Sequence, residues 1–287
     1  MATESKQLRM NRDALEAYWQ DLSRRHLQQS EDGFEVICYA GMPPWFNKFI
    51  HRYQMKAFSR LLHDQSFADC DVLDVGTGVG RWARWYASWP DARVTGIDIE
   101  PERLERARSL GAGPTYNTMS VDSLAFDDAS FDVVNSVTVL QHVPHEMKRR
   151  AIAEIARVLR PGGRVVLFEV TDMHDDAPHV FPWPAAAWQS EFAQHGLTVH
   201  RTIGDHYIPL LRMLSRVHRV ANGARARHEI GAFKQGRSTA ADRAKRVVLR
   251  AAVAVSYPIE DVCRFLPPRT ARITGFLLEK PREEAAR

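Results

Sequence analysis

The sequence predicts an α/β fold in which helices cover a mainly parallel sheet. An apolar run of strand length, 72–75, is followed by three closely spaced glycines and a helical segment with three tryptophans. A second apolar run, 94–97, stops at Asp98. Alternating strands and helices are typical of a parallel sheet, and ligands bind outside the carboxyl ends of such strands.

The glycines Gly76, Gly78 and Gly80 predict a ligand-binding turn. Glycine has no side chain, so its backbone can turn sharply and approach a ligand closely. The free N–H groups at the following helix start favour polar or anionic groups. A dinucleotide fingerprint would need a glycine where Arg81 stands, and a phosphate P-loop is absent. Taken alone, the glycines could also form an ordinary tight turn.

An acid two residues before G-x-G-x-G resembles the first motif of the class I S-adenosylmethionine (SAM) methyltransferases. The resemblance implies a Rossmann-like, seven-stranded methyltransferase sheet with SAM as the cofactor. Asp98 would accept hydrogen bonds from the ribose hydroxyls. The cofactor residues implied in this unit are Asp74, Gly76, Thr77, Gly78, Gly80, Asp98 and Ile99.

The next unit continues this pattern with a helix at 101–110, which begins with proline, and a strand at 115–120. The following segment resembles the family's third motif, in which an acid meets the adenine amino group. Asp122 is the matching residue, with Ser123 beside it. A carboxylate suits this place because the exocyclic amine only donates. A solvated acidic loop is the alternative, and it fits Asp127 better than Asp122.

A fourth strand at 132–137 leads into LQHVP, which also resembles the family. There the backbone after the strand touches the methionine part of SAM, a role that falls to Ser136 and Val137. Gln141 and His142 would face the methyl group. Imidazole suits a general base that removes a hydroxyl proton, although a capping or core histidine explains His142 equally well.

The remaining elements follow in order. A helix at 145–160 ends in a Pro-Gly-Gly turn, and a strand at 164–170 follows within LRPGGRVVLFE, again a family resemblance. A helix at 185–195 and a strand at 197–202 come next. The antiparallel last strand of the family is assigned to 272–278.

The acceptor site should be formed outside this core. Helical patterns at 13–27 and 45–62 predict an aromatic-rich N-terminal lid, although core packing explains most of these aromatics. Open α/β folds bind ligands beyond the strand ends, so the loop after 164–170 should border the pocket. The candidate substrate contacts are Trp45, Asn47, Glu169, His174 and His179. The spacing of histidines and acids in this loop fits no defined metal site, so no metal is expected.

An insertion at 206–268 separates the last two strands. Its part 206–250 has eleven basic and two acidic residues, a net charge of +9 against +4 for the whole chain. A solvated helical cap is the first interpretation, followed by recognition of an anionic substrate or an acidic membrane surface. Nucleic acid ranks lowest, because aromatic residues are few there.

Composition limits the remaining classes. The 287 residues divide into a lid (1–68), a SAM-binding core (69–205), the basic cap (206–268), and a last strand with its tail (269–287). Three scattered cysteines argue for a reducing cytoplasm. The polar first residues do not resemble a signal peptide, and no apolar run approaches the ~20 residues of a membrane span.

The sequence thus predicts SAM-dependent methyl transfer to a small organic acceptor, with a hydroxyl oxygen of a natural product or sugar ranked first. Methylation of nitrogen or carbon is the second interpretation. A SAM-binding partner protein without catalysis is the third. Homo-oligomerisation is left open.

Overall fold

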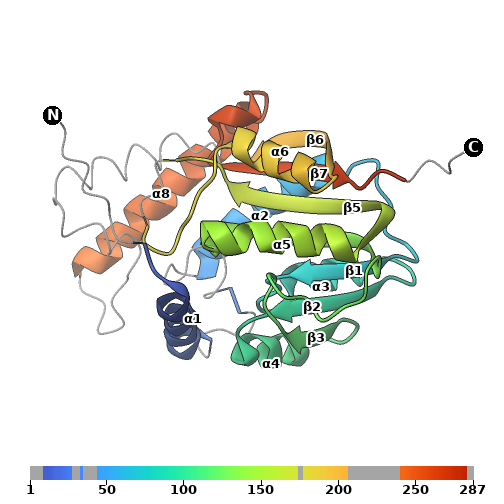
Figure 1. Ribbon diagram of the computed structural model, residues 1–287. Coiled ribbons are helices and arrows are strands. Elements are labelled where there is room, and N and C mark those ends of the chain that lie inside the picture. The colour runs from blue at the N-terminus through green and yellow to red at the C-terminus, as the bar shows by residue number, and fades with distance from the viewer. Residues whose placement is uncertain (1–8, 28–32, 35–43, 174–176, 206–239, 283–287) are drawn as a thin grey trace, which may run out of the picture.

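Seven strands form one sheet in the computed structural model, which describes residues 9–27, 33–34, 44–173, 177–205 and 240–282. Their spatial order is β3-β2-β1-β4-β5-β7-β6. The first five are parallel, and β7 is antiparallel to both β5 and β6, which confirms the predicted α/β sheet (Figure 1). The strands are β1 (Asp71–Val75), β2 (Arg93–Asp98), β3 (Thr115–Thr118), β4 (Phe131–Val137), β5 (Leu159–Val170), β6 (Thr198–Asp205) and β7 (Ile273–Glu279).

The helices start where local chemistry favours a helix end. Asn11 caps the first helix by accepting a 2.9 Å hydrogen bond from Ala14 N–H, and α4 begins with Pro101. The helices are α1 (Arg12–His26), α2 (Pro44–Leu61), α3 (Arg81–Tyr86), α4 (Pro101–Ser109), α5 (His145–Val158), α6 (Ala185–Gln194) and α8 (Ala240–Cys263). The part of the chain that the structure describes also has the short 3₁₀ turns η1 (Leu140–His142) and η3 (Pro268–Thr270).

The two faces of the sheet carry separate apolar layers, because successive strand residues point to opposite faces. On one face, Leu73 and Val75 pack with residues of α5 and α6. On the other, Val72 packs with residues of α2, α3 and α4. Helix α2 therefore packs as part of the core, as the interpretation of its aromatics as core residues predicted.

Two predicted boundaries are corrected. Helix α5 ends at Val158, and β5 already begins at Leu159 because Phe131 pairs with Leu159 across the sheet. The expected turn at 161–163 therefore lies inside β5, where Gly162 has φ +82° and its N–H bonds Lys280 O. Helix α3 ends at Tyr86, and Trp89 follows it in a turn.

The described part of the insertion contains the long helix α8, which extends beyond the end of the sheet (Figure 1). Lys56 on α2 forms a 2.9 Å ion pair with Asp261 on α8. Residues 206–239, which contain most of the basic residues counted in the insertion, lie outside the described residues. Among the helices described, none combines the length and the apolar character needed to cross a membrane.

Candidate functional site

The turn after β1 is open on one side and tightly packed on the other. Gly76 and Gly78 have φ +60° and +54°, a left-handed conformation that glycine adopts without strain. A Cβ on Gly76 would collide with Val139, whereas one on Gly78 would meet nothing within 4 Å. The turn thus presses against the segment after β4 and leaves space above Gly78.

Asp74 stabilises the turn through buried hydrogen bonds. Its carboxylate is fully buried and accepts 2.6 Å hydrogen bonds from Thr77 Oγ1 and Asn135 Nδ2. Burial raises the pKa of Asp74 to about 6, although both hydrogen bonds favour the charged form. Asp74 and Thr77 therefore shape the turn, and a cofactor would meet backbone rather than the Asp74 carboxylate.

Asp98 connects β2 to the same turn. Its Oδ2 accepts a 2.8 Å hydrogen bond from Gly78 N–H, and its Oδ1 accepts one of 3.0 Å from Glu100 N–H. A carboxylate has about four lone-pair sites, so two hydroxyls can still be accepted. Ile99 beside it is exposed.

The predicted adenine side lies next to Asp98. Met119 N–H donates to Asp98 O at 3.0 Å, which brings the segment after β3 alongside the tip of β2. The Asp122 carboxylate is almost completely buried, accepts from Ser120 Oγ, and lies 3.3 Å from Arg150. Ser123 is exposed.

A nucleoside cofactor fits three features of this site, which are the space above Gly78, the unused acceptor sites of Asp98 and the buried hydroxyl of Ser136. In the register of the sheet, Ser136 pairs with Val75, immediately before the glycine turn. Its Oγ is buried and has no partner among the described residues. Val137, the next residue, is also buried.

The turn after β4 is built on one carboxylate. Glu169, at the end of β5, is fully buried and accepts hydrogen bonds of 2.7–3.1 Å from the N–H groups of Val139, Leu140 and Gln141. Burial raises the pKa of Glu169. The predicted substrate contact of Glu169 is corrected on this geometry, because the carboxylate is fully buried and accepts hydrogen bonds from three backbone N–H groups at η1.

His142 is held from both ring nitrogens. Gln141 Oε1 accepts from Val170 N–H at 3.1 Å, so Gln141 Nε2 is the donor to His142 Nε2, 3.0 Å away. His142 Nδ1 then carries the proton and donates to His179 O at 2.9 Å. The ring is neutral in this arrangement, and its basic nitrogen is covered by the Gln141 amide.

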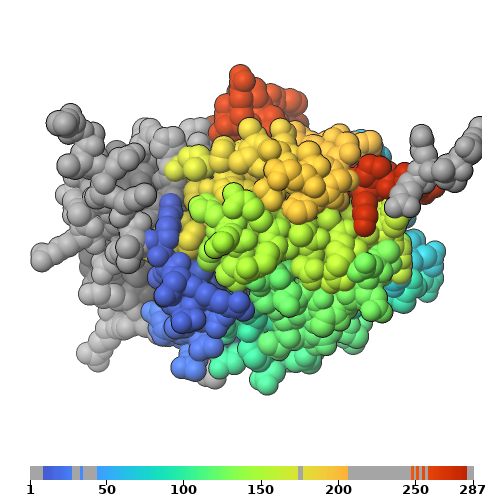
Figure 2. Space-filling view, in the orientation of Figure 1, coloured from blue at the N-terminus to red at the C-terminus, as the bar shows by residue number. Residues whose placement is uncertain are grey.

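Helix α1 packs beside His142 through Trp19, and Figure 2 shows α1, in dark blue, lying against the green segments of the chain. The Trp19 ring meets His142 edge-on with 4.8 Å between centroids, and the Tyr18 ring stacks on His179 at 4.7 Å. Leu27 packs with Val79 of the glycine turn. The segment before β1 thus covers both the predicted cofactor turn and the predicted base.

The other predicted acceptor residues lie in different surroundings. Asn47 is fully buried, and its amide donates to Phe34 O at 2.7 Å. Trp45 contacts Phe46 and the guanidinium of Arg250. His179 joins the His142 cluster, and His174 lies outside the described residues. The structure therefore brings His179 to His142, whereas the contacts described for Trp45 and Asn47 are with other residues.

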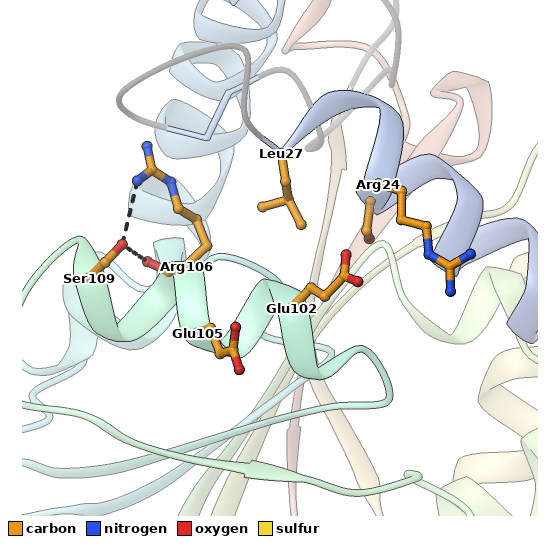
Figure 3. Close-up of a pocket in the computed structure, with 7 residues that line it drawn as sticks. Arg24, Leu27, Glu102, Glu105, Arg106 and Ser109 are labelled. Atoms are coloured by element: carbon orange, nitrogen blue, oxygen red, sulfur yellow. Dashed lines mark hydrogen bonds between the residues drawn. The ribbon is translucent and has the colours of Figure 1, made fainter.

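A further depression of about 590 Å³ lies between α1 and α4 (Figure 3). Arg24 of α1, Leu27 directly after α1, and Glu102, Glu105 and Arg106 of α4 line it (Figure 3). It includes none of the predicted site residues. Within the described part of the chain, no three His, Cys, Asp or Glu side chains form a metal-binding group.

The sequence placed Trp19 in the aromatic-rich lid without assigning it a contact with His142, and it did not single out Lys148. Lys148 is fully buried, donates to Phe181 O, and lies 4.7 Å from the Trp183 ring. Burial lowers its pKa. A lysine on an amphipathic helix normally indicates a solvent face, so no sequence signal marked it as buried.

Comparison with known proteins identifies the central segment. A family model described as a methyltransferase domain matches residues 73–167. The O-methyltransferase cnsE of Penicillium expansum is 39% identical over 109 residues, which cover 36% of this chain and 39% of the relative. The O-methyltransferase resE of Aspergillus sclerotiorum is 35% identical over 168 residues, 56% of this chain and 55% of the relative. The chain thus spans about 55% or less of these relatives.

Solved structures share the fold over almost the whole chain. The [4+2]-cyclase SpnF aligns with a TM-score of 0.59 and 17% identity, covering 96% of this chain and 98% of its own. A putative sarcosine dimethylglycine methyltransferase from Galdieria sulphuraria aligns with a TM-score of 0.54 and 18% identity, covering 93% and 100%. At these identities the likeness establishes the fold alone.

Proposed function

We propose, from the methyltransferase domain at residues 73–167, that this chain transfers a methyl group from SAM to a small organic acceptor, first of all to a hydroxyl oxygen. The hydrogen bond from Gly78 N–H to Asp98 supports this most directly, since it joins the glycine turn to the carboxylate that would bind the ribose hydroxyls. The relatives named O-methyltransferases support oxygen as the acceptor atom.

When bound, SAM supplies an electrophilic methyl carbon on a sulfonium. The residues of this chain have three tasks. Asp98 would hold the nucleoside through its unused acceptor sites, and the open space above the Gly78 backbone would accommodate it. Trp19 and Tyr18 exclude water from the acceptor side. Holding the acceptor and the methyl donor in the correct orientation lowers the activation barrier by at most about 7–11 kcal/mol. His142 accepts the hydroxyl proton at Nε2 once the Gln141 amide moves away.

The test is turnover with SAM on a panel of phenols, hydroquinones and sugar alcohols, read by mass spectrometry of the methylated product. His142→Ala should lower kcat by ~10²–10⁴-fold, the range expected for a general base, with little change in SAM affinity. His195→Ala is the matched control, because His195 follows α6 and lies 3.3 Å from Glu191, outside the site. Unchanged kcat in His142→Ala would remove the base assignment and favour an activated carbon or amine acceptor.

A second candidate is a SAM-binding partner protein without catalysis. The observation that favours it is the filled acceptor side, where Trp19, His179 and Gln141 all contact the His142 ring. Saturable binding of SAM without turnover on any acceptor would support this candidate over the first.

A further inference from the structure

Helix α8 has an unusual distribution of residues around its axis. Its exposed side chains include Val247, Val255 and Val262, whose exposed fractions are 67%, 58% and 69%. They recur every seven or eight residues, which places them on one side of a helix. Among the side chains that the structure describes, the other large apolar ones exposed on or just after α8 are Val248, Ile259, Phe265 and Leu266.

The polar side chains described on α8 lie toward the protein instead. Glu260 is buried, and Asp261 forms its ion pair with Lys56 of α2. The guanidinium of Arg250 lies 5.2 Å from the Trp45 ring at the start of α2. A surface helix of a water-soluble domain normally shows the opposite arrangement, with the apolar stripe inward. An exposed apolar stripe on this scale marks a contact surface.

Charge indicates which surface this helix contacts. Arg264 and Arg269 are exposed just after α8, while the two acids whose side chains are described on α8 are buried or paired. The sequence adds a net +9 over 206–250. An apolar stripe flanked by basic residues matches a helix lying in the headgroup region of an anionic bilayer. A second copy of this chain would bring the same positive charge to the contact.

We infer that α8 docks the protein on an anionic membrane surface, with the stripe Val247, Val255 and Val262 in the acyl boundary and the arginines on lipid headgroups. The sequence alone ranked this below a solvated cap, because it does not reveal that the apolar face of α8 points outward. The inference does not depend on methyl transfer, since only binding to lipid is measured.

The experiment is flotation of the full chain with vesicles of phosphatidylcholine alone, or of phosphatidylcholine with phosphatidylglycerol. Wild type should float with the anionic vesicles, and raising the NaCl concentration should weaken this binding, because salt screens the headgroup contacts. The double variant Val255→Asp/Val262→Asp should bind the anionic vesicles at least about tenfold more weakly than the wild type. Both side chains are exposed, so circular dichroism should show an unchanged fold.

Met173→Asp is the matched control, since Met173 is 54% exposed but lies outside α8. It should float like the wild type. The absence of flotation, equal flotation with neutral vesicles, or equal binding of the double variant would each overturn the inference. It would also be overturned if the wild type sediments as a dimer that the double variant dissociates, with neither form binding vesicles, because α8 would then be a contact between copies.

Discussion

Asp74 illustrates how a motif residue can act without touching a ligand. Its position before the glycines was predicted, yet its carboxylate bonds Thr77 and Asn135 inside the protein. Residue type and spacing were enough to predict the turn, because an acid at a strand end followed by three glycines at alternate positions is typical of a tight ligand-binding turn. The partner Asn135 lies 61 positions away, and spacing cannot reveal such a contact.

The raised pKa of Asp74 predicts a pH dependence of stability. The folded protein retains a proton up to about pH 6, whereas the unfolded carboxyl releases it near its ordinary pKa of 3.8. The stabilisation is therefore complete below the unfolded value and is lost as the pH rises through 6. The free energy of unfolding of wild type minus that of Asp74→Asn should fall by about 2.4 kcal/mol from pH ~4 to pH ~7.

Urea unfolding at several pH values measures this difference. Taking it against Asp74→Asn removes the contributions of the other titrating groups. A difference that stays constant over this range would mean that Asp74 ionises in the folded state as it does in water.

At the level of elements, the turn η1 depends on the end of β5. Glu169 joins three backbone N–H groups of the turn that carries His142. The sequence predicted the strand before this turn and the strand that ends at Val170, and the structure confirms both strands. It assigned Glu169 to substrate, because an acid at a strand end is typical of a ligand site and the backbone donors of η1 are not visible in sequence.

Glu169→Gln should destabilise the protein by about 2 kcal/mol, because the amide NH₂ would face Gln141 N–H and leave buried donors unpaired. Urea unfolding measures the loss. Glu146→Gln, on the exposed start of α5, is the control and should change stability by less than ~0.5 kcal/mol. Equal stability of Glu169→Gln and wild type would show that the η1 turn does not need the carboxylate.

At the level of the whole molecule, alternation of strands and helices predicted the parallel sheet, and the family resemblance predicted its antiparallel last strand. The direction of α8 was not predictable, because an amphipathic pattern shows that a helix has two faces and does not show which one points inward. Reaction type is not fixed by the fold either, since one solved structure that shares it is titled a [4+2]-cyclase.

Every role proposed for the site requires that the glycine turn and Asp98 bind a sulfonium nucleoside. Calorimetric titration with S-adenosylhomocysteine, the demethylated cofactor, measures this binding, with NAD as the competing ligand. Gly78→Ala fills the open space above the turn, and Gly196→Ala is its match, because Gly196 has φ +70° and an added Cβ there would meet nothing within 4 Å. Both should cost about 1–2 kcal/mol of stability from the same left-handed strain.

We expect saturable binding of S-adenosylhomocysteine by wild type and Gly196→Ala, binding at least tenfold weaker by Gly78→Ala (about 1.4 kcal/mol), and none of NAD. Binding of NAD in its place, or equal affinity of the two glycine variants for S-adenosylhomocysteine, would contradict the assignment of this turn to SAM.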